Sequence, residues 1–177
     1  MALDDDPTDM PLGRSIGRAH KFTRMWGDSL LAPLDGSVTE WIVLFHIAAA
    51  DPPGASQSEV ARFSDMGGPA LVRHVDRLEA DGLVTRTRDD EDRRVVRLAL
   101  TDAGHDRLAA LRDVMASADA TLRAVLTEEE AHTMQVALGK VFRACIDALG
   151  RAGVLTGPTV PFNGVHRRLD LPARRTE

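Results

Sequence analysis

Arginine is the residue type whose spacing in this chain suggests a chemistry. Six of the arginines in the middle of the sequence are candidate contact residues: Arg73, Arg77, Arg86, Arg88, Arg93 and Arg94. A guanidinium group is a planar fork of N–H donors that fits both phosphate oxygens and the major-groove edge of guanine. The whole chain has a formal net charge of −5, so the acidic excess must lie elsewhere, where it would discourage non-specific binding. These residues predict a local nucleic-acid contact on an otherwise acidic protein.

A pair of short helices is expected to position the first of these arginines. Ser56 and Glu59 have the spacing of a capping box, in which a hydroxyl and a carboxylate each satisfy a free backbone N–H at a helix start. Gly67-Gly68 interrupts that helix, and Pro69 suits the first turn of the next one. The sequence therefore predicts two consecutive helices with a tight connection.

An apolar stripe identifies the buried face of the second helix. It consists of Leu71, Val75 and Leu78. This spacing is that of one helix face, and it leaves Arg73, His74 and Arg77 mostly off the stripe, toward solvent or a partner. Gly82 is a typical residue for ending the helix.

A basic two-stranded hairpin is predicted after the helix pair, with strands at residues 83–88 and 95–101 and a highly charged tip between them. The adjacent Arg93 and Arg94 suit a narrow minor groove, whose negative potential attracts them. A charge-assisted hydrogen bond from an arginine to the carboxylate of Asp92 could fix the direction of that arginine. The alternative is that the tip is only a solvated turn. A helix pair followed by such a hairpin is a winged helix-turn-helix, which places its second helix in a DNA major groove.

Several runs of this sequence resemble the multiple-antibiotic-resistance regulator (MarR) family. The runs are residues 71–84, 92–94 and 98–104. Further runs are similar to its SlyA-like subgroup, namely residues 11–13, 39–44 and 57–58. The resemblance covers about residues 11–150. It implies a dimeric, helical transcription factor with one winged domain in each subunit, often released from DNA by small aromatic acids.

The predicted fold is mainly α with a small β-hairpin: a winged helix-turn-helix domain plus a helical dimerisation region. We expect a single MarR-like domain at residues 11–150. Its expected parts are dimerisation helices at 11–35 and 103–150 and the winged helix-turn-helix at 37–101, with a disordered tail at 1–10 and a flexible tail at 151–177. The terminal helices carry more apolar surface than a small winged domain needs, which favours pairing with a second copy. The alternative is that these helices fold back on their own domain.

Twelve residues are candidate DNA contacts: Gln57, Ser58, Pro69, Ala70, Arg73, His74, Arg77, Arg86, Arg88, Asp92, Arg93 and Arg94. Arg73 is the main candidate for a base or phosphate contact, and the alternative is a solvated helix arginine. Gln57 and Ser58 open a helix whose first N–H groups suit a phosphate, although ordinary capping explains them equally well. Ala70 stands where SlyA-like sequences tend to have a hydroxyl, which leaves only an apolar contact for it.

A second candidate site follows from the SlyA-like resemblance. It places Lys21, Arg24, Thr39 and Trp41 at positions that match the salicylate site of that subgroup. A cation for a carboxylate, an indole for an aromatic ring and a hydroxyl for orientation are suitable chemistry for such a ligand. The alternative is that Lys21 and Arg24 are solvated and that Trp41 is plain core. A small aromatic acid is therefore a hypothetical effector.

Other functional classes find little support in the sequence. It has no glycine-rich phosphate loop, no His-Glu-x-x-His motif and no cysteine pair, so we predict no enzyme, no cofactor and no metal. The single Cys145 is typical of a reducing cytoplasm. No apolar stretch has the length of a membrane span, and the acidic residues 4–6 are unlike a signal peptide.

The sequence thus predicts a cytoplasmic homodimer that binds double-stranded DNA at a palindromic operator and regulates transcription, with repression as the expected sign. The competing hypothesis is a winged domain that serves protein–protein contacts without sequence-specific DNA binding. It would be favoured if the acidic residues 89–92 neutralised the arginines of the wing.

Overall fold

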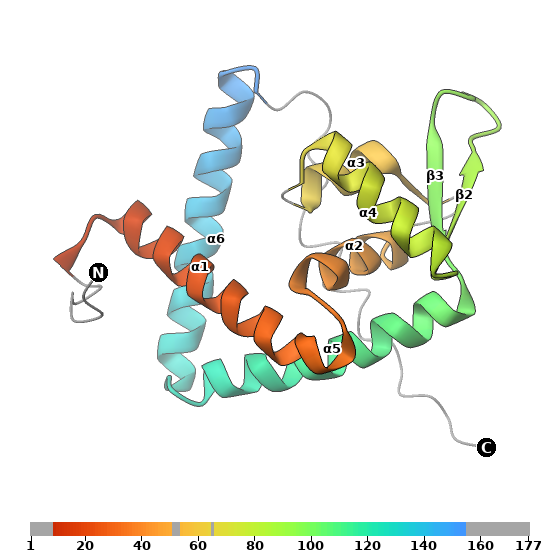
Figure 1. The fold of residues 1–177 in the computed structure, drawn as a ribbon. Coiled ribbons are helices and arrows are strands. Elements are labelled where there is room, and N and C mark those ends of the chain that lie inside the picture. The colour runs from red at the N-terminus through yellow and green to blue at the C-terminus, as the bar shows by residue number, and fades with distance from the viewer. Residues whose placement is uncertain (1–8, 51–53, 65, 155–177) are drawn as a thin grey trace. The chain divides into compact units, whose positions relative to one another are not determined.

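The structure of this chain is a computed structural model, and it describes residues 9–50, 54–64 and 66–154 (Figure 1). Most of the two expected tails, at residues 1–10 and 151–177, lies outside the described residues. The described residues are mostly helical, with a small antiparallel sheet, so the predicted fold class is confirmed. They divide into two compact units, one up to Met115 and one from Ala116 onward.

The first unit begins with three helical segments: α1 (Leu12–Leu31), the 3-10 helix η2 (Ala32–Leu34) and α2 (Val38–Ala48). The hydroxyl oxygen of Ser37 accepts the backbone N–H of Glu40 at 3.1 Å, which caps the start of α2. The side chain of Asp28 on α1 accepts the next free N–H, that of Val38, at 2.8 Å. Two side chains therefore accept free backbone N–H groups in the first turn of α2, and one of these side chains belongs to α1.

The predicted helix pair forms α3 (Gln57–Phe63) and α4 (Gly68–Ala80). The capping box at the start of α3 is confirmed. The hydroxyl oxygen of Ser56 accepts the N–H of Glu59 at 3.2 Å, and Glu59 Oε2 accepts the N–H of Ser56 at 2.7 Å. These two bonds fix where α3 begins.

The apolar stripe of α4 is confirmed as its buried face. The buried residues of this helix are Leu71, Val75 and Leu78. Past the helix end, Gly82 adopts a left-handed φ of 70°, which costs glycine little. The chain then turns so that the N–H of Leu83 donates to the carbonyl oxygen of Leu78 at 2.9 Å. This turn leads directly into the sheet.

The sheet has three antiparallel strands in the order β1-β3-β2: β1 (Ala55–Ser56), β2 (Val84–Arg88) and β3 (Val96–Leu100). In the register, Arg86 lies opposite Leu98. Directly opposite side chains point to the same face of a sheet, so Arg86 shares the face of the fully buried Leu98. The strand β1 was not predicted, because two residues carry no detectable alternation.

The core of the first unit is formed by α2, α3, α4, the sheet and the first half of α5 (Asp102–Arg123). The fully buried large side chains include Leu44, Leu71, Leu98 and Leu111. Gly104 on α5 packs against the backbone, and a Cβ there would lie 2.0 Å from the carbonyl oxygen of Leu83. Thr101 Oγ1 accepts the N–H of Gly104 at 3.0 Å, so the residue that starts α5 also fixes this close approach.

The second unit contains the end of α5 and the whole of α6 (Glu128–Arg151). Thr127 forms a capping box with Glu130 at the start of α6. This helix exposes large apolar side chains on one side: Met134 (49%), Leu138 (44%), Phe142 (49%) and Leu149 (40%).

Among the described residues, no single helix has the length and apolarity of a membrane span. One bent pair, Leu12–Leu34 with Val38–Ala48, meets that test only when the two are taken together.

Candidate nucleic-acid interface

The outer surface of α4 presents two predicted contact residues to solvent. Arg73 and Arg77 are both exposed, whereas the apolar stripe of the helix is buried. The Nε of Arg77 lies 3.7 Å from the carboxylate of Asp81, and both side chains are exposed, so this ion pair is weak. Within the described residues, no hydrogen bond or ion pair uses the guanidinium of Arg73. Arg73 is therefore free to bind a partner.

His74 lies on the inner side of α4. The ring is half-buried, and its Nε2 is buried without a hydrogen-bond partner. It lines a cavity of about 440 Å³ together with Glu40 and Arg107. Desolvation lowers the pKa of His74 below its usual value, so the ring is favoured in its neutral form. This position suits packing between helices better than contact with DNA.

Arg86 is engaged within the protein. From β2, its Nη2 lies 2.7 Å from Asp76 Oδ1 and its Nη1 lies 2.6 Å from Glu79 Oε2. Nη2 also donates to the carbonyl oxygen of Val72 at 3.3 Å. All three acceptors belong to α4. The side chain predicted as a DNA contact therefore points at the neighbouring helix.

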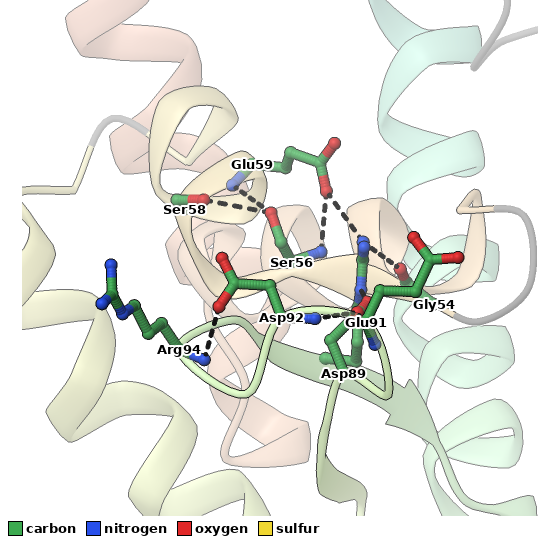
Figure 2. A network of polar contacts seen from close by, with 9 residues as sticks. Gly54, Ser56, Ser58, Glu59, Asp89, Glu91, Asp92 and Arg94 are labelled. Atoms are coloured by element: carbon green, nitrogen blue, oxygen red, sulfur yellow. Dashed lines mark hydrogen bonds and ion pairs between the residues drawn. The ribbon is translucent and has the colours of Figure 1, made fainter.

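The wing is the β2–β3 hairpin, and its turn is built on Asp89 (Figure 2). Asp89 Oδ1 accepts the backbone N–H groups of Glu91 at 2.9 Å and Asp92 at 3.0 Å. Asp89 Oδ2 accepts the Nε–H of Arg97 at 2.7 Å. These bonds lower the pKa of Asp89 below its usual value, and the bond from the backbone N–H of Asp92 has the largest effect. The acidic residue thus shapes the turn and is not an unpaired charge on its surface.

Arg97 on β3 joins that turn to the start of α3. Its Nη1 donates to the carbonyl oxygen of Gly54 at 3.3 Å and lies 3.8 Å from Glu59 Oε2. The pKa of Glu59 is lowered, first by its hydrogen bond with the Ser56 side chain and further by the charge of Arg97. Sequence reasoning missed Arg97, because its bond to Gly54 spans 43 positions of the chain. The only signal was its alternation with the apolar residues of the strand.

The arginines at the tip of the wing remain exposed. Asp92 Oδ1 accepts the backbone N–H of Arg94 at 3.0 Å. Asp92 therefore orients the backbone of Arg94, whereas the sequence predicted a bond to an arginine guanidinium. Arg88 Nη1 donates to the carbonyl oxygen of Arg93 at 2.7 Å. Figure 2 shows the Arg94 side chain extending away from the labelled carboxylates. In the described chain, neither the Arg93 nor the Arg94 guanidinium takes part in a hydrogen bond or ion pair.

The other predicted contacts lie at the starts of α3 and α4. Gln57 is half-buried, and the exposed Ser58 has its Oγ 3.0 Å from the Oγ of Ser56. Pro69 is exposed in the first turn of α4. The N–H of Ala70 already donates to the carbonyl oxygen of Gly67 at 2.9 Å, so a partner could meet only its methyl group.

The structure brings together two of the four predicted ligand residues. Arg24 Nη2 on α1 donates to Thr39 Oγ1 on α2. Trp41 is partly buried, and its ring centroid lies 5.7 Å from that of Phe45. The Nε1 of Trp41 is buried and has no hydrogen-bond partner. Lys21 is exposed.

A comparison with sequence families agrees with this geometry. The MarR family model matches residues 34–95, which include α2, the helix pair, β2 and the tip of the wing. The resemblance to the MarR family is confirmed. The SlyA-like subgroup stays a prediction, because the matching model describes the family as a whole.

Solved structures of MarR-type proteins match the chain over nearly their whole length. The reduced form of MarR from E. coli is 28% identical, with a TM-score of 0.65, and the match covers 75% of this chain and 96% of that one. The transcriptional repressor CouR, bound to a 23-mer DNA duplex, is 27% identical, with a TM-score of 0.69 and coverages of 80% and 99%. The S. aureus MepR–DNA complex shares the fold at 22% identity, with a TM-score of 0.69 and coverages of 77% and 99%. The chain has the fold of a MarR-family transcriptional regulator.

Proposed function

We propose that this protein is a homodimeric, sequence-specific DNA-binding regulator that represses transcription from a palindromic operator. The observation that carries the proposal is the placement of three exposed guanidinium groups that are unpaired within the described residues. Arg73 lies on the outer surface of α4, and Arg93 and Arg94 lie at the tip of the wing. In a winged helix-turn-helix these two places meet the major groove and an adjacent minor groove.

The proposed contacts are of two kinds: those that recognise base edges and those that bind the phosphate backbone. Arg73 is proposed to donate to a base edge, with guanine O6 and N7 as the acceptors that fit a guanidinium fork. Arg77, Gln57 and Ser58 are proposed to anchor phosphates, and Ala70 to offer its methyl group to thymine. Arg93 and Arg94, supported by Arg88 at the base of the tip, are proposed to enter the minor groove, where narrow A·T-rich sequence concentrates negative potential.

The proposed dimer uses the terminal helices, residues 11–35 and 103–150. The exposed apolar side of α6, from Met134 to Leu149, supports this role because such a surface is costly to leave in water. A two-fold dimer presents two copies of α4, which must reach half-sites about 34 Å apart. Repression is proposed because CouR, of similar sequence and fold, is named a repressor and is seen bound to DNA.

The direct test is selection of duplexes from a random pool by the purified full-length chain, followed by fluorescence anisotropy over a range of salt concentrations. We expect enrichment of a palindrome that binds at least about 10³-fold more tightly than an unrelated duplex. Affinity should fall steeply with salt, because bound phosphates release counterions. Sedimentation should give the mass of a dimer. Equal, weak binding to every duplex would contradict the proposal.

A winged domain used only for protein contacts is the competing function. It would be favoured if the arginines of the wing were neutralised within the fold. Arg86 and Arg97 are paired with carboxylates, but the tip residues Arg93 and Arg94 are not. This difference between the base and the tip of the wing favours DNA.

We also propose that a small aromatic acid releases the protein from DNA by binding near Arg24, Thr39 and Trp41. The support is the unpartnered, buried Nε1 of Trp41 and the hydrogen bond between Arg24 and Thr39, which joins α1 to α2. A carboxylate could replace Thr39 as the acceptor for Arg24. Such a ligand acts only through different affinities for the DNA-binding and released conformations.

A further inference from the structure

The contact between Arg86 and α4 joins the two parts of the proposed DNA-binding surface. Its three acceptors, the carbonyl oxygen of Val72 and the carboxylates of Asp76 and Glu79, follow one another at helical spacing on one side of α4. A single guanidinium therefore spans about two turns of the helix. Its side chain is only 21% exposed, although both carboxylates are at the surface.

The sheet register fixes the direction of this side chain. Arg86 lies opposite Leu98, whose side chain is fully buried, and Val84 on the same side of β2 is also buried. Alternation along the strand then turns the side chain of Arg86 toward the helices of the unit and away from the face of its exposed neighbours Thr85 and Thr87.

The charges on α4 make the contact more than a packing detail. Asp76 and Glu79 lie on the same helix as Arg73, so their bonds to Arg86 tie the wing to the helix that is proposed to read the major groove. Arg86 places a positive charge within 2.7 Å of each. A planar guanidinium can hold three acceptors in this arrangement, whereas the compact ammonium group of lysine holds them with less defined geometry.

We propose that Arg86 is a positioning residue: it locks the wing to α4, so that the major-groove and minor-groove contacts are held in one register, and it does not itself bind DNA. This inference rests on the proposed function. It assigns a role to Arg86 that differs from the direct contact expected from the sequence. It also makes Asp76 and Glu79, acidic residues on a DNA-binding helix, necessary for tight binding.

A double-mutant cycle on the selected operator tests the proposal. Arg86→Ala should weaken binding about tenfold in the wild-type background but less than about twofold when Arg93→Ala and Arg94→Ala are already present, because its effect passes through the wing. Thr87→Ala, on the exposed face of the same strand, is the matched control and should leave the affinity unchanged. Additive losses would overturn the proposal.

Salt dependence and a conservative replacement separate positioning from direct contact. If Arg86 binds a phosphate, Arg86→Ala should reduce the salt slope by about one unit, and Arg86→Lys should bind like wild type. Under the proposal, the slope is unchanged and Arg86→Lys resembles Arg86→Ala. A lower thermal stability alone would not produce this pattern, since binding is measured far below the unfolding temperature.

A second readout needs no DNA and so remains meaningful if the proposed function fails. In ¹⁵N relaxation of the free protein, the amides of residues 89–94 should become more mobile in Arg86→Ala than in Thr87→Ala. If Arg86→Ala does not fold, Asp76→Ala combined with Glu79→Ala removes the two side-chain acceptors and should give the same mobility and the same non-additive cycle. An unchanged wing in the relaxation data would overturn the locking role. Weak, non-selective DNA binding by wild type would instead contradict the proposed function.

Discussion

Arg107 on α5 and Glu40 on α2 form a two-bond ion pair across 67 positions of the chain. Arg107 Nε donates to Glu40 Oε1 at 2.7 Å, and Nη2 donates to Oε2 at 3.2 Å. Nη1 donates to the carbonyl oxygen of Leu34 at 2.8 Å. The side chains are 22% and 11% exposed, and the hydrogen bond to Glu40 raises the pKa of Arg107 above its usual value. One guanidinium thus fixes the start of α2 and the end of η2 to α5.

Loss of this pair should destabilise the first unit. Arg107→Ala leaves Glu40 partly buried without its partner, and we expect about 1–3 kcal/mol lower free energy of unfolding in urea titration. The control is Arg112→Ala on the same helix, whose contact with Asp113 is a long, exposed one at 3.8 Å. That variant should cost less than about 0.5 kcal/mol. Equal effects of the two substitutions would contradict the structural role of the pair.

A methyl group at Gly104 should be poorly tolerated. The Cβ of Gly104→Ala would lie 2.0 Å from a backbone oxygen, that of Leu83, so α5 or the turn before β2 must shift. We expect a loss of about 1–3 kcal/mol in unfolding free energy. Gly139→Ala on α6 is the matched control. There the nearest atom is an arginine side-chain nitrogen at 3.7 Å, and alanine should be neutral or stabilising. A wild-type melting temperature for Gly104→Ala would show that the close approach is absent in solution.

Stability should fall on acidification through the carboxylates at the wing turn and at the start of α3. The pKa values of Glu59 and Asp89 are both lowered in the folded state, from ordinary values of 4.5 and 3.8. The unfolded state therefore binds protons more readily, so the stabilisation is complete above these values and is lost as pH falls through the lower folded pKa values. Glu59→Gln should be less stable than wild type at pH 7 and should show a smaller loss toward pH 3 in urea titrations. Asp90→Asn, at an exposed position of the same turn, is the control for the removal of one negative charge. Parallel pH profiles for wild type and Glu59→Gln would contradict this account.

Helix and wing should contribute differently to operator binding. Arg73→Ala should cost about 1–3 kcal/mol on the selected operator and relax base preference at the position it reads. Arg93→Ala or Arg94→Ala should weaken binding with a smaller change in preference, because the minor groove carries less base information. Arg62→Ala, an exposed arginine on α3, should change little. Wild-type binding by all three test variants would place the DNA on another face.

Release by an aromatic acid has a calorimetric test. Salicylate or benzoate should bind at up to millimolar concentration and weaken operator binding. Arg24→Ala and Trp41→Ala should blunt this effect while ligand-free DNA binding stays largely intact. Trp41→Phe, which keeps an aromatic ring in place of the indole, separates loss of the Nε1–H donor from loss of packing. No heat and no tryptophan quenching with any aromatic acid would remove the effector proposal and leave the DNA-binding proposal unaffected.

The sequence predicted those elements whose signals are local. The capping box at Ser56 and the apolar stripe of α4 depend on residues within a few positions of each other, and both are confirmed. The wing also follows from short-range alternation. Local patterns specify elements well because helix and strand periodicity act over single turns and adjacent residues.

Contacts between distant segments could not be predicted in this way. The partner of Glu40 on α5 and the partner of Arg97 at Gly54 depend on packing that no local pattern encodes. Arg86 lies between these cases. Its alternation with the buried Val84 indicates an inward direction, whereas its place in a basic wing indicates a DNA contact, and a local pattern does not decide between the two.

The bond from Arg97 to Gly54 has a consequence for how the winged domain opens. Arg97 holds Asp89 in the wing turn and the carbonyl oxygen before β1, and it lies beside Glu59 at the cap of α3. Neither the turn nor the cap can separate from the sheet without breaking a contact of the Arg97 guanidinium that the two share. We therefore expect the amides of Glu59, Glu91 and Asp92 to exchange with deuterium as one cooperative group under native conditions. A protease cut within residues 89–94 should accordingly loosen the start of α3 as well.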